Sequence, residues 1–214
     1  MPRDVADQPE PPGPLTLTAV TPAATTTLAA ALARVLQGGD LLGLTGELGA
    51  GKTHFVRGLA QGLGINPAQV SSPTFVLLHE YTPPATPPTP ATAPNPKSEI
   101  RNSKSCLPLA HLDLYRLGGV EELETLGWGE AGDELRRDAI VAVEWADRFP
   151  EAMGSDWLEI ELAHGPGDGR TITITPHGAW RPRMADVSRR LQATLGGANT
   201  PRVSDHQASP EGDG

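Results

Sequence analysis

A glycine-rich loop between an apolar strand and a helix is the feature that most constrains this chain. The loop has the sequence GELGAGKT at residues 46–53, which fits the pattern G-x-x-x-x-G-K-[ST] at every required position. The apolar run 41–44 before it predicts a strand, and residues 55–63 after it favour a helix. A chance glycine-rich turn would not combine the lysine, the hydroxyl and both flanking elements, so this context indicates a phosphate-binding loop.

The residue types in the loop suit a phosphate chain. Glycine allows backbone conformations that are closed to other residues, so successive N–H groups can face one anion, and the start of the following helix adds further N–H groups. We expect Lys52 to reach the β- and γ-phosphates from an exposed loop, and the Thr53 hydroxyl to bind magnesium. The residues expected to contact the nucleotide are Gly46, Glu47, Leu48, Gly49, Ala50, Gly51, Lys52 and Thr53.

Length and composition indicate one domain with unusually long loops. The 214 residues suffice for one core but not for two large ones. The chain has 24 glycines and 22 prolines, and the proline-rich segments cannot form a packed core. We predict a disordered tail over 1–14, a nucleotide-binding domain over 15–180 with a proline-rich loop inserted at 82–109, and a short helix with a polar tail over 181–214.

Charge, cysteine content and hydropathy argue against several classes of protein. The net charge of −9 argues against a broad basic surface, so no DNA partner is expected and any other nucleic acid would be contacted through a protein partner. The single cysteine, Cys106, excludes a disulfide framework and a cysteine zinc site, and fits a reducing compartment. No apolar run approaches the roughly 18 residues of a membrane span, and the N-terminus does not resemble a signal peptide. We therefore expect a cytoplasmic protein.

Hydrophobic periodicity predicts the remaining elements. Strand patterns occur at an edge position (15–20), around the proline-rich insertion (75–81 and 110–115), in a continuous apolar run (139–143) and in a C-terminal hairpin (157–162 and 170–175). Helical patterns begin at Thr21-Pro22 and end at Gly38, and occur again over 118–128 and 184–195. The chain therefore has the alternation of strands and helices that is typical of the α/β class.

Two acids stand at strand positions that suit a metal or a catalytic water. A loop that serves hydrolysis needs a carboxylate to hold magnesium and a group to place the attacking water. Glu144 follows the apolar run 139–143 and is expected at the carboxyl end of a buried parallel strand. Asp113 shares one strand face with His111 by two-residue periodicity. The alternatives are a plain strand-end acid for Glu144, and a solvated face or an ion pair with Arg116 for Asp113.

Other polar and aromatic residues near these acids allow more than one interpretation. His111 fits a structural histidine and a site residue equally well. Trp145 can cover a base or a cofactor edge, or it can simply pack. Glu121, Glu122 and Glu124 favour a solvated helix face or a surface for a partner, without a catalytic role.

At these residues the chain resembles a known family. The segments GELGAGKTHFVRGLAQGLG, SSPTF, HLDLYRL with a following EELETLG, and VEWADRFP occur in the order found in the bacterial TsaE (YjeE) family of P-loop ATPases, over residues 16–180. The HxDxYR and EW motifs are not general features of P-loop proteins, so the combination is specific. The resemblance implies a P-loop NTPase fold, with a mixed parallel and antiparallel sheet flanked by helices and the C-terminal antiparallel hairpin added to it.

The resemblance also implies a function and its partners. The family takes part in making N6-threonylcarbamoyladenosine next to the anticodon of tRNAs that read codons beginning with A. It works with the TsaB–TsaD pair, in which TsaD transfers the threonylcarbamoyl group. For this chain we therefore expect ATP and Mg²⁺ as cofactors, a TsaB–TsaD-like complex as partner and only indirect contact with tRNA. We expect weak ATP hydrolysis by the chain alone and stimulation by the partner.

Roles for individual residues follow from the same resemblance. It implies residues 46–53 as the phosphate loop with Lys52 catalytic, Thr53 and Glu144 as magnesium ligands, and Asp113 as an active-site acid. Thr74, in the segment SPT, is implied as a sensor of the γ-phosphate. The chain departs from the family at His54, where a second Thr or Ser is usual, and this puts only the α-phosphate contact in doubt.

Three other functions compete with this interpretation. A small-molecule kinase would need a cationic lid, but the long loop 82–109 carries only Lys97, Arg101 and Lys104 as cations, among many prolines. A GTPase is disfavoured because the sequence has no N-K-x-D segment and no D-x-x-G after the loop. A nucleotide-gated binding module, in which hydrolysis only resets a partner complex, remains open and is compatible with the first interpretation.

Overall fold

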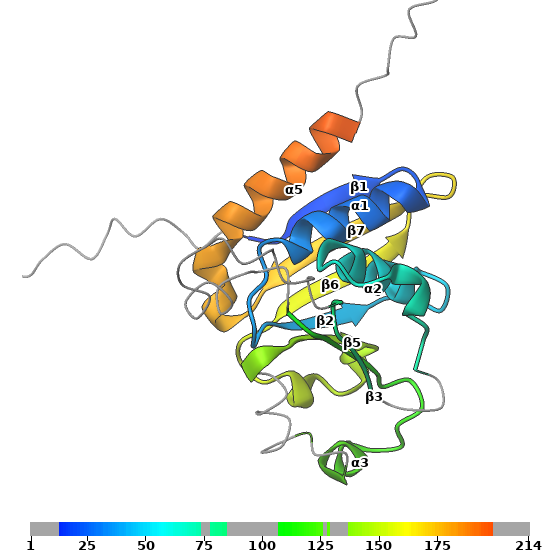
Figure 1. Ribbon diagram of the computed structural model, residues 1–214, viewed down its shortest axis with the longest axis vertical. Helices are drawn as coiled ribbons and strands as arrows, with labels where there is room; N and C mark the ends of the chain where they lie inside the picture. Colours follow the sequence, from blue (N-terminus) through cyan, green and yellow to red (C-terminus); the bar gives the residue numbers. More distant parts are fainter. Residues whose placement is uncertain (1–12, 74–77, 85–106, 126–127, 129–136, 199–214) are drawn as a thin grey trace, which may run out of the picture.

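The fold is built on one seven-stranded sheet, shown in Figure 1. A computed structural model describes residues 13–73, 78–84, 107–125, 128 and 137–198. The strand order is β1-β7-β6-β2-β5-β4-β3. The strands are β1 (Leu15–Ala19), β2 (Leu41–Thr45), β3 (Leu78–Tyr81), β4 (Leu109–Asp113), β5 (Ile140–Glu144), β6 (Leu158–His164) and β7 (Arg170–Pro176).

The sheet is parallel in its middle and antiparallel at its sides. Strands β6, β2, β5 and β4 run parallel to one another, whereas β3 pairs antiparallel with β4, and β7 pairs antiparallel with β6 and β1. The edge strand, the hairpin around the insertion and the C-terminal hairpin are all present, although β4 ends at Asp113 and not at the predicted residue 115. This confirms the expected mixed α/β sheet.

Helices α1 (Pro22–Ala33) and α2 (Lys52–Gly62) lie side by side on one face of the sheet (Figure 1). Helix α1 begins as predicted, because the Thr21 hydroxyl accepts a hydrogen bond from the Ala24 N–H at 3.1 Å and Pro22 occupies the first turn. It ends at Ala33, before the predicted stop at Gly38, although Leu36 beyond it is fully buried.

Helix α5 (Met184–Ala198) packs against α1 near β1 (Figure 1). It is longer than the predicted helix over 184–195. It is more than a surface helix, because Met184, Val187 and Leu191 are buried in the same core as α1 and α2. The fourth helix described, α3 (Val120–Thr125), is shorter than the predicted 118–128.

Strand β5 is buried on both faces, as its continuous apolar run predicts. Ile140 and Ala142 belong to the core under α1 and α2, whereas Val141 and Val143 belong to a second core on the opposite face, which includes Leu123 of α3. The alternation continues to Glu144, so its side chain lies on the α2 face. This places the last side chain of β5 next to the phosphate loop.

Gly43 allows an aromatic ring to lie directly against strand β2. A Cβ atom at Gly43 would meet the Trp157 ring and, at 2.9 Å, the Cβ atom of Ala146. The Trp157 ring stacks on His177 with 4.3 Å between the centroids. The second core therefore closes around β2 only because position 43 has no side chain.

The ends of the proline-rich insertion contact the domain. Pro83 is buried, and Leu107 packs against the core under α1 and α2. The insertion predicted over 82–109 therefore makes a core contact at Leu107, which the expectation of a segment without core packing missed. Residues 85–106, and residues 74–77 with the predicted site residue Thr74, lie outside the described part of the chain. None of the described helices is both long and apolar enough to cross a membrane.

Candidate active site

The phosphate loop connects the end of β2 to the start of α2. Gly51, which caps α2, has a φ of 103°, a conformation that favours glycine, and it offers no side chain to the first turn of the helix. The N–H groups of that turn are therefore available to an anion. Leu48, at the tip of the loop, is 78% exposed.

Lys52 is folded back onto its own loop. Its Nζ donates hydrogen bonds to the carbonyl oxygens of Gly46 at 2.6 Å and Glu47 at 3.0 Å, and it lies 3.5 Å from the centroid of the Trp145 ring. Residues 47–49 of the loop are exposed, as expected, but only 5% of Lys52 is exposed, so the expectation that the lysine itself is exposed is wrong. The reason is that the loop's carbonyl oxygens and the tryptophan ring together bind the ammonium group.

Burial lowers the pKa of Lys52 below its ordinary value of 10.5, because the ammonium form loses hydration. The carboxylates of Glu144, Asp147 and Asp113 act in the opposite direction and favour the charged form. The lysine thus interacts electrostatically with both predicted acids, Glu144 and Asp113, and with Asp147.

Thr53 and Glu144 are joined directly. The Thr53 hydroxyl donates to Oε1 of Glu144 at 2.7 Å, and Nε2 of His111 lies 2.8 Å from the same oxygen. An ionised carboxylate only accepts hydrogen bonds, so His111 presents its N–H from Nε2. Glu144 is 3% exposed and His111 fully buried. His111 therefore contacts the predicted magnesium ligand Glu144, and both interpretations of this histidine are compatible with that contact.

Asp113 lies at the end of β4, directly opposite Glu144 in the register of β4 and β5. Its Oδ2 accepts a hydrogen bond from the Ser72 hydroxyl at 2.8 Å, and its Oδ1 accepts one from the Tyr115 N–H at 2.9 Å. Because Asp113 is only 7% exposed, a solvated strand face is excluded. The structure thus brings both predicted acids to one edge of the sheet, and it ties Asp113 to the segment that leads to Thr74.

Trp145 adopts an unusual backbone conformation next to Glu144. Its φ of 61° is the only positive value at a non-glycine position among the described residues. This turn places the ring under Lys52 and 4.8 Å from the centroid of Tyr115, which is 49% exposed. In this structure the ring packs against the lysine, and a contact with a base remains a prediction.

The donor set fits a hard divalent cation. The hydroxyl of Thr53 and the carboxylate of Glu144 supply oxygen, which magnesium prefers. Among the described residues no group of three or more His, Cys, Asp or Glu side chains could hold a metal ion by itself.

Two residues near the loop have contacts that sequence reasoning missed. His54 turns toward α1, where its Nε2 lies 2.8 Å from the Thr26 hydroxyl and 2.9 Å from the Pro22 carbonyl oxygen. Arg170, the first residue of β7, donates from Nε to the Ala50 carbonyl oxygen at 2.6 Å. No local pattern could have indicated the second contact, since 120 positions separate the two residues.

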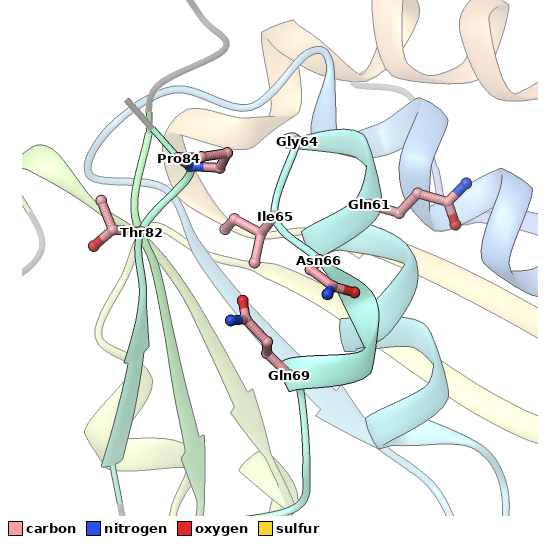
Figure 2. A pocket seen from close by; sticks show the side chains of 7 residues that line it. All are labelled: Gln61, Gly64, Ile65, Asn66, Gln69, Thr82 and Pro84. Carbon is pink, nitrogen blue, oxygen red and sulfur yellow. The ribbon is translucent and has the colours of Figure 1, made fainter. Parts of the chain in front are cut away.

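A cavity of about 570 Å³ lies at the other end of α2 (Figure 2). Gln61 and Gly64, at and just beyond the end of the helix, line it together with Asn66, Gln69 and Thr82. None of its lining residues belongs to the phosphate loop, and Lys52 starts the helix that Gln61 nearly ends. This cavity is therefore separate from the candidate active site.

Comparison with known proteins gives a consistent result. A family model described as threonylcarbamoyl adenosine biosynthesis protein TsaE matches residues 19–172. A protein of Streptomyces coelicolor described as tRNA threonylcarbamoyladenosine biosynthesis protein TsaE is 38% identical over 162 residues, which cover 73% of this chain and 93% of that protein. A protein of Bacillus subtilis with the same description is 35% identical, over 74% of this chain and 84% of that protein.

The fold is also similar to a solved structure. The crystal structure of Bacillus subtilis YdiB superimposes with a TM-score of 0.56 and 29% sequence identity, covering 82% of this chain and 95% of that protein. The matched family region contains the phosphate loop, Asp113 and Glu144, and it includes the segment where Arg170 begins β7.

Proposed function

Because this chain belongs to the TsaE family of threonylcarbamoyl adenosine biosynthesis proteins, we propose that it is a magnesium-dependent ATPase of that pathway. We propose that it acts with a TsaB–TsaD-like complex in the cytoplasm, and that its ATPase cycle serves the modification of adenosine next to the anticodon. The single observation that supports this best is the Thr53 hydroxyl at 2.7 Å from Glu144, at the start of the phosphate-loop helix.

Nucleotide binding requires Lys52 to move. In the structure the ammonium group is held by the carbonyl oxygens of Gly46 and Glu47 and by the Trp145 ring. A β- or γ-phosphate offers a charged acceptor in place of two neutral ones, and charge-assisted hydrogen bonds are the stronger kind. Lys52 would therefore exchange its carbonyl partners for phosphate oxygens, while the N–H groups at the start of α2 bind the same chain.

Thr53 and Glu144 would hold magnesium. The ion would neutralise the negative charge that develops on the phosphate oxygens during phosphoryl transfer. His111 keeps the carboxylate of Glu144 in position through its Nε2–H. The two hydrogen bonds to Oε1 of Glu144 hold this carboxylate in one orientation.

Asp113 is the residue that we propose for the attacking water. It is restrained by the Ser72 hydroxyl and by the Tyr115 N–H, so its carboxylate is held at the end of β4. The link to Ser72 supports a second proposal, that the segment leading to Thr74 responds to the γ-phosphate. A change at that segment would then alter the orientation of Asp113 and the surface offered to a partner.

The proposal is tested by measuring ATP hydrolysis with Mg²⁺ or with excess chelator, with and without a purified TsaB–TsaD pair from the same organism. We expect weak magnesium-dependent turnover alone, stimulation in the complex, and different affinities of the pair for the ATP-analogue and ADP forms. Because of the net charge of −9, we expect only weak binding of free tRNA.

The same measurements separate the competing functions. Equal affinity of the pair for both nucleotide forms, or tight and salt-sensitive binding of tRNA by this chain alone, would contradict a partner-gated ATPase. Phosphate transfer to a small molecule without release of inorganic phosphate would favour a kinase. Nucleotide-dependent binding without turnover in the complex would favour a nucleotide-gated binding module.

A further inference from the structure

Arg170 holds the phosphate loop from a position outside the predicted nucleotide contacts. Its Nε donates to the Ala50 carbonyl oxygen at 2.6 Å, and its Nη2 donates to the Gly49 carbonyl oxygen at 3.2 Å. Its Nη1 donates to the carbonyl oxygens of Asp168 and Gly169 in the β6–β7 turn, at 3.1 and 2.7 Å. One guanidinium group thus connects the loop to the turn of the C-terminal hairpin.

The backbone of Arg170 is itself fixed. It pairs with Ala19 of β1 and with His164 of β6, so the side chain starts from a central strand of the antiparallel part of the sheet. The loop, by contrast, has three glycines with positive φ, Gly46, Gly49 and Gly51. Glycine-rich backbone has many accessible conformations, and a rigid external partner reduces their number.

The contact with Ala50 determines the direction of the neighbouring N–H. The described chain has no cis peptide bonds, so the carbonyl of Ala50 and the N–H of Gly51 lie in one peptide plane and point in opposite directions. Because the Ala50 carbonyl is directed at Arg170, the Gly51 N–H is directed away from it. A Cβ atom at Gly51 would lie 3.6 Å from Nε, which places the guanidinium close to this peptide.

Arg170 also adds positive charge beside the loop. Within the described part of the chain no carboxylate forms an ion pair with it, whereas the guanidinium of Arg183 is paired with Asp40 at 2.6 Å. All four hydrogen bonds of Arg170 are to neutral carbonyl oxygens, so none of them pairs its positive charge with a carboxylate. A positive charge next to a phosphate-binding loop favours an anionic ligand.

We propose that Arg170 is a positioning residue for nucleotide binding, which keeps the loop in the conformation that presents the Gly51 N–H to phosphate. This rests on the proposed ATP-binding function. Because the residue acts through the loop backbone, it sets the affinity for ATP and ADP and has little effect on the chemical step. The role requires the planar fork of arginine, since one lysine ammonium cannot reach the loop carbonyls and the turn carbonyls together.

The test compares Arg170→Ala and Arg170→Lys with the control Arg183→Ala. The Arg183 guanidinium also connects two segments, but it donates its hydrogen bonds to Asp40 and to the Val35 carbonyl oxygen. Dissociation constants for ADP and for a non-hydrolysable ATP analogue are measured by calorimetry, kcat and KM by phosphate release in the TsaB–TsaD complex, and Tm by calorimetric scanning. All binding is measured well below the lowest Tm.

We expect both Arg170 variants to weaken ADP and ATP-analogue binding by about tenfold, the scale of one lost charge-assisted hydrogen bond. The KM for ATP should rise by a similar factor while kcat changes by less than about threefold. Arg183→Ala should lower Tm and leave nucleotide affinity unchanged. Lowered Tm with unchanged nucleotide affinity in both Arg170 variants would show a purely structural role and overturn the inference.

Two further outcomes also decide the matter. Full affinity in Arg170→Lys alone would overturn the proposed backbone contact, because it would show that charge without the fork suffices. A loss confined to kcat would likewise overturn it. If the unmodified protein binds no nucleotide, the proposed ATPase function fails. If the unmodified protein and both Arg170 variants bind nucleotide equally well, only the proposed role of Arg170 fails.

Discussion

The Thr53 hydroxyl donates a hydrogen bond to Oε1 of Glu144 at 2.7 Å, although 91 positions separate the two residues in the sequence. Thr53 lies in the first turn of α2 and Glu144 ends β5. The parallel pairing of β2 with β5 aligns the two strand ends, so the loop that follows β2 meets the last side chain of β5. Ligands bind at this edge of parallel sheets.

Removal of either partner should weaken magnesium-dependent nucleotide binding. For Thr53→Ala and Glu144→Gln we expect a loss of about tenfold or more in affinity for a Mg²⁺–ATP analogue, the scale of one lost metal contact. The double variant should lose less binding free energy than the two single variants lose together, because the two side chains act as a unit. Calorimetric titration with and without Mg²⁺ measures this. Normal hydrolysis by Glu144→Ala, together with loss of magnesium dependence only in Asp113→Ala, would show that the two acids have the opposite roles.

Lys52→Met should abolish ATP hydrolysis without loss of stability. The ammonium group serves the phosphates, and methionine keeps most of the apolar volume without the cost of burying a charge. The measurements are phosphate release and the free energy of unfolding in denaturant. Lys97→Ala is the matched control, since it removes a lysine of the proline-rich insertion. Unchanged hydrolysis in folded Lys52→Met protein would refute the phosphate-loop assignment.

The lowered pKa of Lys52 predicts a pH dependence of stability. Burial holds the folded-state pKa below the ordinary 10.5, so at neutral pH the buried ammonium disfavours folding. As pH rises through the folded-state pKa toward 10.5, the folded protein loses this proton while the unfolded chain retains it. The stability of the unmodified protein should therefore increase relative to Lys52→Met over that window. Parallel denaturant titrations across alkaline pH measure the difference, and a constant difference would contradict the prediction.

Gly43→Val should destabilise the protein by about 1–3 kcal/mol, the usual cost of overpacking a core. The new side chain would meet the Trp157 ring and the Ala146 side chain. Combining it with Trp157→Leu should recover part of the loss, because the smaller side chain leaves room for valine. Chemical denaturation of the four proteins tests this. If the losses in the free energy of unfolding are strictly additive, the Trp157 ring is not the group that the new side chain at position 43 meets.

Deletion of residues 85–106 should preserve the fold and ATP hydrolysis. Tyr81 of β3 pairs directly with Leu109 of β4, so a short turn can join the two strands. The deletion retains Pro83 and Leu107, which contact the domain. Shortening a loop lowers its closure cost by only about 0.6 kcal/mol per halving, so Tm should stay close to that of the full chain. A large fall in Tm would show that the deleted segment contributes to folding.

Local sequence patterns were sufficient for most of the fold and for the identity of the candidate site residues. The glycine loop, the apolar run 139–143 and the C-terminal hairpin depend on backbone preferences and side-chain periodicity, which act between near neighbours in the chain. The same periodicity placed Asp113 and His111 on one strand face. The family resemblance rested on these same motifs and was confirmed by the comparisons.

Only the tertiary structure decided which of those residues touch. The order of strands brings Glu144 to Thr53 and Arg170 to Ala50, across 91 and 120 positions, and no local pattern encodes that order. The sequence predicted that Lys52 binds phosphate, but it did not predict the contact of its ammonium group with the Trp145 ring, which depends on the positive φ of residue 145. Periodicity specifies the face on which a side chain lies. Its hydrogen-bond partner is specified by the packing of distant segments, which becomes defined only when the whole sheet has formed.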